Sequence, residues 1–389
     1  MVTGISKGQL SELPPRLPNP GIGRKEGIKM TDHEYMERAI SLARHGTGWT
    51  NPNPLVGAVI VKDGRIIGEG YHAKYGELHA ERNAFASLTE NAEGATLYVT
   101  MEPCCHYGKT PPCTEAILEH KIARVVIGSR DPNPKVSGKG AAILRAAGIR
   151  VEEDFMREEC DSLNPVFFHY IMTNTPYVVM KYAMTADGKI ATRTGASKWI
   201  TGEAARMKVQ EMRYTYSGIM AGIGTVLADD PLLNVRIGGK RSPVRIICDS
   251  CLRIPENSKI VQTADEYRTI IACADGPDEK KARLQSRGIQ ILTLPDENGR
   301  VDLMKLMNAL GREKIDSILL EGGGTLNYSA LQAGIVKEVK AFVAPKIFGS
   351  NQAATPVAGG GIARPDEAVR MKLKNISEIG EDLLLEYIL

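Results

Sequence analysis

The sequence predicts two consecutive α/β domains. Short apolar segments alternate with segments of helical periodicity through residues 31–172, and the same alternation resumes after Thr175-Pro176. Strands that alternate with helices are typical of sheets covered by helices. The chain has 389 residues, enough for two or three ordinary domains. We place the domains at residues 30–172 and 173–389.

Composition and charge narrow the class of protein. Hydrophobic residues make up 43% and charged residues 24%, as in folded globular proteins. The formal net charge of +3 is too small to favour a nucleic acid or an anionic membrane as partner. No apolar run is long enough to span a bilayer, and no secretory signal is visible.

The seven cysteines are odd in number and scattered along the chain, which favours a reduced, cytoplasmic protein. Four of them have no ligand-like neighbours and are predicted to be packing residues. These four are Cys160, Cys248, Cys251 and Cys273.

Residues 1–29 are predicted to form a disordered extension. Four prolines between residues 14 and 20 and three glycines after them leave no hydrophobic period. The natural chain could begin at Met30. An organelle targeting segment is the weaker alternative, because this stretch contains little serine or arginine.

The first domain is predicted to begin with a helix from about residue 32 to 43, capped by Thr31 or Asp32. Asp63-Gly64 is a strong hairpin signal between strands at 55–62 and 65–71. The later elements are helices at 79–88, 114–120 and 140–147, strands at 96–100 and 124–128, and a helical connection over 155–172.

The second domain is predicted to contain eight strands with helices between them. These strands are expected at residues 177–183, 218–222, 244–249, 269–274, 290–294, 317–321, 338–343 and 383–387.

One histidine and two cysteines form the most informative motif of the chain. His79 and Glu81 are separated by one residue, and Cys104 and Cys113 follow nine positions apart. One imidazole and two thiolates can hold zinc in three tetrahedral positions and leave the fourth to water, whose pKa the metal lowers. Glu81, two residues after His79, is placed to move protons to and from that water. The pattern is that of zinc nucleobase deaminases, which usually separate the cysteines by three positions.

Two alternatives accompany this interpretation. Cys105 competes with Cys104 for one ligand position, and we prefer Cys104 because it directly follows Pro103. The site could also be structural and closed by a fourth protein ligand such as His106. A carboxylate beside the metal has no role in a structural site, so Glu81 favours catalysis.

At this point the chain resembles the bifunctional deaminase/reductase family of riboflavin biosynthesis, over residues 31–389. The motifs that carry the resemblance lie at 51–59, 79–81, 102–104, 108–113 and 130–134 in the first half and at 186–191, 197–201, 224–231 and 321–324 in the second. The departures are Cys105, where the family usually has serine, and the N-terminal extension.

The resemblance implies a cytidine-deaminase-like three-layer α/β/α domain followed by a dihydrofolate-reductase-like α/β domain. It also implies two reactions. The first is hydrolytic deamination of a diaminopyrimidinone ribosyl phosphate with one zinc ion per chain. The second is reduction of the ribosyl group of the resulting aminouracil to a ribityl group by NADPH.

The same resemblance implies four deaminase substrate contacts, His72, Lys109, Asp131 and Asn133, and the amide of Asn51 is a fifth candidate. Asn51 is expected to bond the pyrimidine edge and Lys109 the phosphate. The alternative for Lys109 is a solvated loop lysine. The alternative for Asp131 and Asn133 is turn formation in Asp-Pro-Asn-Pro.

For the reductase, residues 321–326 follow an apolar strand and are expected to open a helix whose glycines admit cofactor phosphates. Their spacing is not that of a Rossmann motif. The NADPH contacts implied by the resemblance are Ala183, Trp199, Thr225, Asp229, Ser250, Gly323, Gly324 and Thr325. The implied substrate contacts are Ser197, Arg213, Leu233, Arg236 and Glu321.

Two of these positions are arginines, and Arg213 and Arg236 suit a phosphate dianion, with surface salt bridges as the alternative. Lys181 is a charged residue in an apolar strand. It could orient or protonate the opened sugar, with Glu321 or Asp229 nearby.

Two other classes of function compete with this interpretation. A nucleic-acid-editing deaminase would need a basic face and stacking aromatic residues, which the small net charge and 5% aromatic content oppose. A non-catalytic zinc-stabilised binding protein would need a fourth ligand and would have no use for Glu81. We expect small phosphorylated pyrimidines as ligands, neither nucleic acid nor membrane as partner, and a homo-oligomer through an uncovered edge of the second domain.

Overall fold

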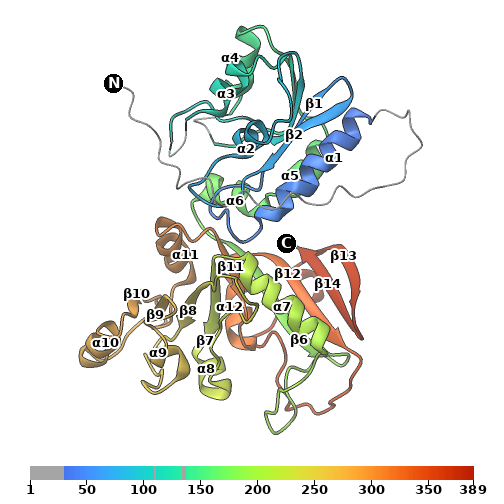
Figure 1. Ribbon diagram of the computed structural model, residues 1–389. Coiled ribbons are helices and arrows are strands. Elements are labelled where there is room, and N and C mark those ends of the chain that lie inside the picture. Colours follow the sequence, from blue (N-terminus) through green and yellow to red (C-terminus); the bar gives the residue numbers. More distant parts are fainter. Residues whose placement is uncertain (1–29, 109–110, 134–136) are drawn as a thin grey trace.

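The computed structural model describes residues 30–108, 111–133 and 137–389, which form two α/β units (Figure 1). The first unit contains a five-stranded sheet in the order β2-β1-β3-β4-β5. Its strands are β1 (Gly57–Lys62), β2 (Arg65–Tyr71), β3 (Thr96–Met101), β4 (Arg124–Ser129) and β5 (Arg150–Glu152). β1 pairs with its two neighbours antiparallel, whereas β3, β4 and β5 run parallel.

Helices cover both faces of this sheet, because alternate strand residues point to opposite sides. Ala58 and Ile60 belong to one buried cluster, and Val59 and Val61 belong to the other. The first cluster packs against α2 (Ala80–Ala86), α3 (Cys113–Glu119) and α4 (Lys139–Ala146). The second packs against α1 (Asp32–Ala43) and α5 (Arg157–Asp161). This is the expected three-layer α/β/α fold.

Local sequence signals explain two features of the first unit. Thr31 caps α1 through a capping box, in which its hydroxyl and the Glu34 side chain each bond the other residue's backbone N–H. Asp63 and Gly64 both have positive φ, as the tight turn between β1 and β2 requires.

The second unit is built on a nine-stranded sheet in the order β10-β9-β8-β7-β11-β6-β12-β14-β13. All neighbours are parallel except the pairs that β14 makes with β12 and β13. The strands are β6 (Tyr177–Thr185), β7 (Gly218–Gly222), β8 (Val244–Cys248), β9 (Thr269–Cys273), β10 (Gln290–Thr293), β11 (Ser317–Leu320), β12 (Val336–Ala344), β13 (Lys372–Ile379) and β14 (Asp382–Ile388).

Helices again lie on both faces of this sheet. One buried cluster joins it to α11 (Leu303–Arg312) and α12 (Gly324–Gln332). Two further clusters join it to α7 (Glu203–Thr215), α8 (Ile223–Asp229), α9 (Lys259–Gln262) and α10 (Asp278–Gln285). Short 3₁₀ helices lie at η1 (Arg44–Gly46) and η2 (Pro365–Glu367). The carboxyl ends of β6, β7 and β11 meet at one edge, where a ligand site is expected in such sheets.

Three expectations from the sequence need correction. The connection over 155–172 is two helices, α5 and α6 (Pro165–Thr173), because Asn164 turns inward and its side chain bonds both backbone groups of Leu55. The strands β5 and β13 were not anticipated. β5 has only three residues, and most of β13 is exposed.

The predicted extension at residues 1–29 lies outside the described residues. In the described part of the chain, no helix is both long and apolar enough to cross a membrane.

Candidate active sites

Three side chains converge at one end of the first sheet. His79 immediately precedes α2, Cys113 is the first residue of α3, and Cys104 lies on the loop after β3. Nδ1 of His79 lies 3.4 Å from Sγ of Cys104 and 3.5 Å from Sγ of Cys113. Tetrahedral zinc would hold such nitrogen and sulfur atoms about 3.6 Å apart, given its usual bond lengths. The residues therefore fit zinc.

The thiols of Cys104 and Cys113 are neighbours, and their pKa values are shifted in opposite directions. The hydrogen bond from Cys113 lowers the pKa of Cys104 to about 4, with a further contribution from His79. The same hydrogen bond, together with burial, raises the pKa of Cys113. This pair is a thiolate with a neighbouring thiol, and a divalent cation would favour deprotonation of both. Cys105 and His106 are not members of the ligand cluster.

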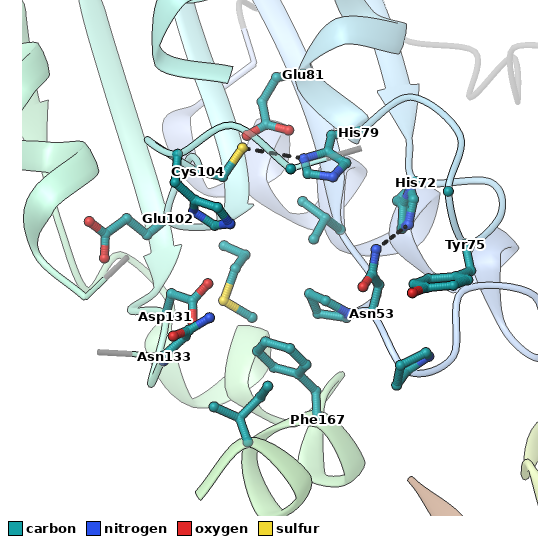
Figure 2. A pocket seen from close by; sticks show the side chains of 18 of the residues that line it. Asn53, His72, Tyr75, His79, Glu81, Glu102, Cys104, Asp131, Asn133 and Phe167 are labelled. Atoms are coloured by element: carbon teal, nitrogen blue, oxygen red, sulfur yellow. Dashed lines mark hydrogen bonds between the residues drawn. The ribbon is translucent and has the colours of Figure 1, made fainter. Parts of the chain in front are cut away.

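Glu81 lies beside these ligands and is only 3% exposed (Figure 2). Burial, and then the negative charge of Cys104, raise its pKa to about 7. Its carboxylate lines the same cavity as His79 and Cys104. A carboxyl group in this position can hold a proton and exchange it with a bound molecule.

The cavity next to the ligand cluster has a volume of about 320 Å³. Its walls come from the loop before β1, the loops after β2, β3 and β4, and helix α6. The residues that line it include Pro52, Asn53, Pro54, His72, Tyr75, Glu102, Asp131, Asn133, Phe167, Tyr170 and Ile171. It is large enough for a heterocyclic ring with a substituent.

His72 and Asn53 fix one side of the cavity. His72 is 2% exposed, and its Nδ1 lies 3.0 Å from the carbonyl oxygen of Leu78. With that nitrogen donating, its Nε2 accepts from the amide of Asn53, at 3.2 Å. Burial lowers the pKa of His72. A neutral imidazole therefore orients Asn53 in the cavity.

Asn51 does not line this cavity, contrary to the expectation that it contacts the pyrimidine. Its amide nitrogen donates to Oδ2 of Asp316 at 2.8 Å, and its oxygen accepts from Arg241 at 3.3 Å. Both partners belong to the second unit. Asn53, two positions later in the same Asn-Pro run, takes the place predicted for Asn51.

Acidic residues line the opposite side of the cavity. Asp131 accepts from the backbone N–H of Asn133, and burial raises its pKa to about 6. Glu102 is 4% exposed and accepts from the backbone N–H groups of Gly138 and Ala141. The structure thus brings Asp131 and Asn133 to the cavity with His72. Lys109 lies outside the described residues.

A buried ion-pair cluster lies at the carboxyl end of β11, beside the middle of β6. Arg213 donates to both oxygens of Glu321, at 2.6 and 3.0 Å, and Lys181 lies 3.5 Å from the same carboxylate. Burial alone would raise the pKa of Glu321, but the two cations lower it to about 2. The third nitrogen of Arg213 donates to the carbonyl of Asn234. In this structure the guanidinium predicted to bind phosphate is therefore held by Glu321.

Glycines surround the same edge of the sheet. Gly323 immediately precedes α12, and Gly222 immediately precedes α8. A Cβ at Gly323 would meet nothing closer than Oγ1 of Thr225, at 3.7 Å, and one at Gly224 would meet nothing within 4 Å. Two helix N-termini thus face open space, which fits the phosphates of a dinucleotide.

The remaining predicted reductase residues surround this edge in different ways. Ser197 donates to Asp229 at 3.3 Å, and the ring of Trp199, which is 61% exposed, packs against Arg206. Leu233 is buried, whereas Arg236 is exposed. Ala183, Ser250, Gly324 and Thr325 lie on β6, after β8 and at the start of α12.

Several cavity residues were not found from the sequence. Tyr75, Phe167 and Tyr170 carry no motif, and helix α6 could be assigned to the cavity only once its packing was known. Asn53 had a signal, since it belongs to the same Asn-Pro-Asn-Pro run as Asn51.

Known proteins show the same two-part organisation. A family described as the cytidine and deoxycytidylate deaminase zinc-binding region matches residues 29–129, and the RibD C-terminal domain matches residues 176–385. Riboflavin biosynthesis protein RibD of Actinobacillus pleuropneumoniae is 57% identical over 359 residues, which cover 92% of this chain and 96% of that protein. The chain belongs to the RibD family.

Other RibD proteins match along the same length. RibD of Escherichia coli (strain K12) is 40% identical and is covered completely. A solved structure of Acinetobacter baumannii RibD superposes with a TM-score of 0.83 at 38% identity, covering 92% of this chain and 98% of that one. A solved structure from Thermotoga maritima superposes with a TM-score of 0.81 at 38% identity, covering 91% of this chain and 97% of that one.

These similarities confirm the predicted fold class and both predicted activities. As a RibD, the chain is a bifunctional enzyme with a zinc deaminase domain and a C-terminal reductase domain. The His79, Cys104 and Cys113 cluster is the candidate zinc site in this domain.

Proposed function

We propose that this chain catalyses two successive steps of riboflavin biosynthesis. It deaminates a diaminopyrimidinone ribosyl phosphate and then reduces the ribosyl group of the aminouracil product with NADPH. The Thermotoga maritima relative is named as a deaminase and reductase for these two compounds. The observation that carries the proposal is the His79, Cys104 and Cys113 cluster with Glu81 beside it, at the wall of a cavity of about 320 Å³.

His79, Cys104 and Cys113 would hold zinc, which supplies an activated water when it is bound. Glu81 then performs the proton transfers. Its buried carboxylate takes the two protons of the water in turn and passes one to a ring nitrogen and the other to the departing amine. The ring carbon exchanges its amino group for oxygen and ammonia leaves, so the proton balance closes without another titrating residue.

The cavity walls suit a planar pyrimidine. Asn53, held by His72, offers an amide to the ring edge, while Phe167 offers an apolar surface. Asp131 and Asn133 lie on the opposite side, where they can bond the polar substituents of the ring (Figure 2). We propose Lys109, which stands between Gly108 and Cys113 in the sequence, as the phosphate partner.

For the second step we propose that NADPH, which supplies a hydride when bound, lies along the carboxyl edge of β7 and β11. Its contacts would be Ala183, Trp199, Thr225, Asp229, Ser250, Gly323, Gly324 and Thr325. We assign Lys181 as the proton donor to the opened sugar, because its ammonium lies 3.5 Å from Glu321, the residue that directly follows β11 at this edge.

The other substrate contacts would be Ser197, Arg213, Leu233 and Arg236, with Glu321. Arg236 is exposed and available to a phosphate, whereas Arg213 would have to exchange part of its bond with Glu321. The proposed enzyme works in the cytoplasm, with domains at residues 30–172 and 173–389.

We also propose that the enzyme is a homo-oligomer. The edge strand β13 is largely exposed and carries Leu373 and Ile376, which are 48% and 55% exposed. An exposed edge strand that carries apolar side chains can pair with a second copy. Light scattering of the purified protein would test this.

The test of the two reactions is incubation of the purified, zinc-loaded protein with the diaminopyrimidinone ribotide, with and without NADPH. Ammonia release should not require NADPH, whereas loss of NADPH absorbance should begin only as the aminouracil forms. Absence of ammonia release, or NADPH consumption that precedes it, would contradict the proposal.

A further inference from the structure

The deaminase cavity is built partly against the reductase unit. Helix α6, which supplies Phe167, Tyr170 and Ile171 to the cavity, lies at the junction of the two units (Figure 1). The hydroxyl of Tyr170 donates to the carbonyl of Gly311 on α11, at 2.9 Å. One cavity wall is therefore bonded directly to the second unit.

Trp49 connects the loops before β1 and after β2, which line the cavity, to the second unit. The Trp49 ring packs edge-on against Tyr214, with 5.9 Å between the ring centres. Its carbonyl accepts from the backbone N–H of Tyr75, which lines the cavity from the loop after β2. Arg241 donates to the carbonyl of Gly48 at 2.6 Å.

Asn51 is the most closely held residue of this contact. Asp316 can only accept and Arg241 can only donate, so together they fix which end of the Asn51 amide faces which partner. Asp316 is 1% exposed, and its other oxygen accepts from the hydroxyls of Ser217, at 2.6 Å, and Ser317, at 2.8 Å. The series of hydrogen bonds from Arg241 through Asn51 thus ends at the carboxylate of Asp316, both of whose oxygens accept hydrogen bonds.

Asn51 is directly followed by Pro52, Asn53 and Pro54, which line the deaminase cavity. A displacement of Asn51 is therefore passed to Asn53, the amide that faces the bound ring. A shift of about 1 Å in a positioning group can cost about a hundredfold in rate.

The contact lies far from the reductase's own reacting groups. Asp316 precedes β11 and Glu321 follows it, so the two carboxylates lie at opposite ends of one strand. Five residues of extended chain span about 16 Å. Changes at Asp316 can therefore be separated from changes in the reductase site.

We propose that Asn51, Asp316 and Arg241 are positioning residues of the deaminase reaction. The second unit, through them, sets the loop that receives the pyrimidine. This inference rests on the proposed function, and it assigns Asn51 to a role outside direct contact with the substrate.

The test exchanges the two partners in the full-length, zinc-loaded enzyme. Asn51→Asp alone sets two carboxylates against each other. Asp316→Asn alone either sets two amide nitrogens against each other or, with its amide reversed, turns an N–H group toward the hydroxyls of Ser217 and Ser317, which now donate to the carboxylate. In the double variant the new amide at position 316 can donate to the new carboxylate at position 51, which still accepts from Arg241. Each single change should lower deaminase kcat/KM by about tenfold or more, mainly through KM, and the double should recover most of it.

Two further measurements and two further variants accompany the exchange. Zinc content should stay at one ion per chain, and reductase activity on directly supplied aminouracil should stay unchanged. Asp366→Asn makes the same chemical change at a side chain that is 66% exposed and should alter nothing. Arg241→Met removes the hydrogen-bond donors on the other side of Asn51. It should lower deaminase activity and spare reductase activity even if Asp316→Asn fails to fold.

The outcomes separate the hypotheses. Normal deaminase kinetics in Asp316→Asn and Arg241→Met would overturn the inference. Damage in both single variants without recovery in the double would assign Asn51 to the substrate itself, and an equal loss of reductase activity would reduce the contact to a general role in folding. If the unaltered enzyme released no ammonia, the proposed function would fall first.

Discussion

Cys104 and Cys105 are adjacent in the chain, but only the first points its sulfur at His79. Cys104 Sγ lies 3.4 Å from the imidazole and accepts from the backbone N–H of Cys113. Cys105 is not part of the ligand cluster, and burial raises the pKa of its thiol. Which of the two adjacent cysteines can bind the metal is therefore decided by the direction of its side chain on the loop after β3.

Substitution of the two cysteines tests this assignment. Cys104→Ser should lose most of the bound zinc after dialysis, because a thiolate ligand becomes a weakly acidic hydroxyl. Cys105→Ser should keep one zinc ion per chain. Metal analysis of both proteins decides the matter, and zinc loss in the second variant alone would reverse the assignment.

The carboxylate of Glu81 gives a second prediction at this scale. Glu81→Gln keeps the shape of the side chain and removes its ability to carry a proton. The variant should retain zinc and lose about a hundredfold to ten-thousandfold in the rate of ammonia release. Unchanged turnover would show that another group transfers the proton.

The sequence could identify the three side chains of the candidate zinc site because residue type and spacing are local properties. It could not separate Asn51 from Asn53, since both follow the same Asn-Pro pattern. What distinguishes them is Asp316, which lies 265 positions away from Asn51 in the chain. Only the folded arrangement brings that carboxylate to the loop.

At the scale of single elements, the strands with long apolar runs were predictable and the others were not. β5 pairs with β4 through three residues, too few for a periodic signal. β13 is polar and exposed over much of its length, and it is a strand because β14 offers it a partner. The division of residues 155–172 into α5 and α6 could not be predicted, because it involves the hydrogen bonds between the Asn164 side chain and the backbone of Leu55, which is distant in the sequence.

The start of α12 allows a prediction with its own control. Gly323 has φ of −79° and space for a methyl group, whereas a Cβ at Gly324 would lie 2.7 Å from the carbonyl of Thr355. Gly323→Ala should therefore keep its melting temperature but weaken NADPH binding, because the added methyl occupies the space that the cofactor phosphates need.

Gly324→Ala should instead lower the melting temperature, because the loop at Thr355 must move to admit the methyl. Thermal unfolding and a fluorescence titration with NADPH separate the two effects. NADPH affinity that is unaltered in the folded Gly323→Ala protein would move the cofactor phosphates away from this helix.

At the scale of the whole molecule, the two reactions depend on different chemistry in different sheets. The zinc ligands lie in the first unit, and the Arg213, Glu321 and Lys181 cluster lies in the second. A cluster of ion pairs needs no metal to keep its geometry. The reductase half should therefore not require zinc.

Removal of the metal tests this separation. Treatment with a chelator that strips zinc should abolish ammonia release while reduction of supplied aminouracil continues at a similar rate. Restoration of zinc should return deamination. Parallel loss of both activities would show that the metal supports the whole fold.

The Arg241–Asn51–Asp316 contact also bears on how the halves can be recombined. Its hydrogen bonds run in one direction. Arg241 of the second unit donates to the amide of Asn51 in the first unit, and that amide donates to Asp316 of the second unit. A chimaeric enzyme made from two relatives would keep a working deaminase only where the graft preserves that order of donor and acceptor. Residues 51, 241 and 316 are thus the first positions to match when such hybrids are designed.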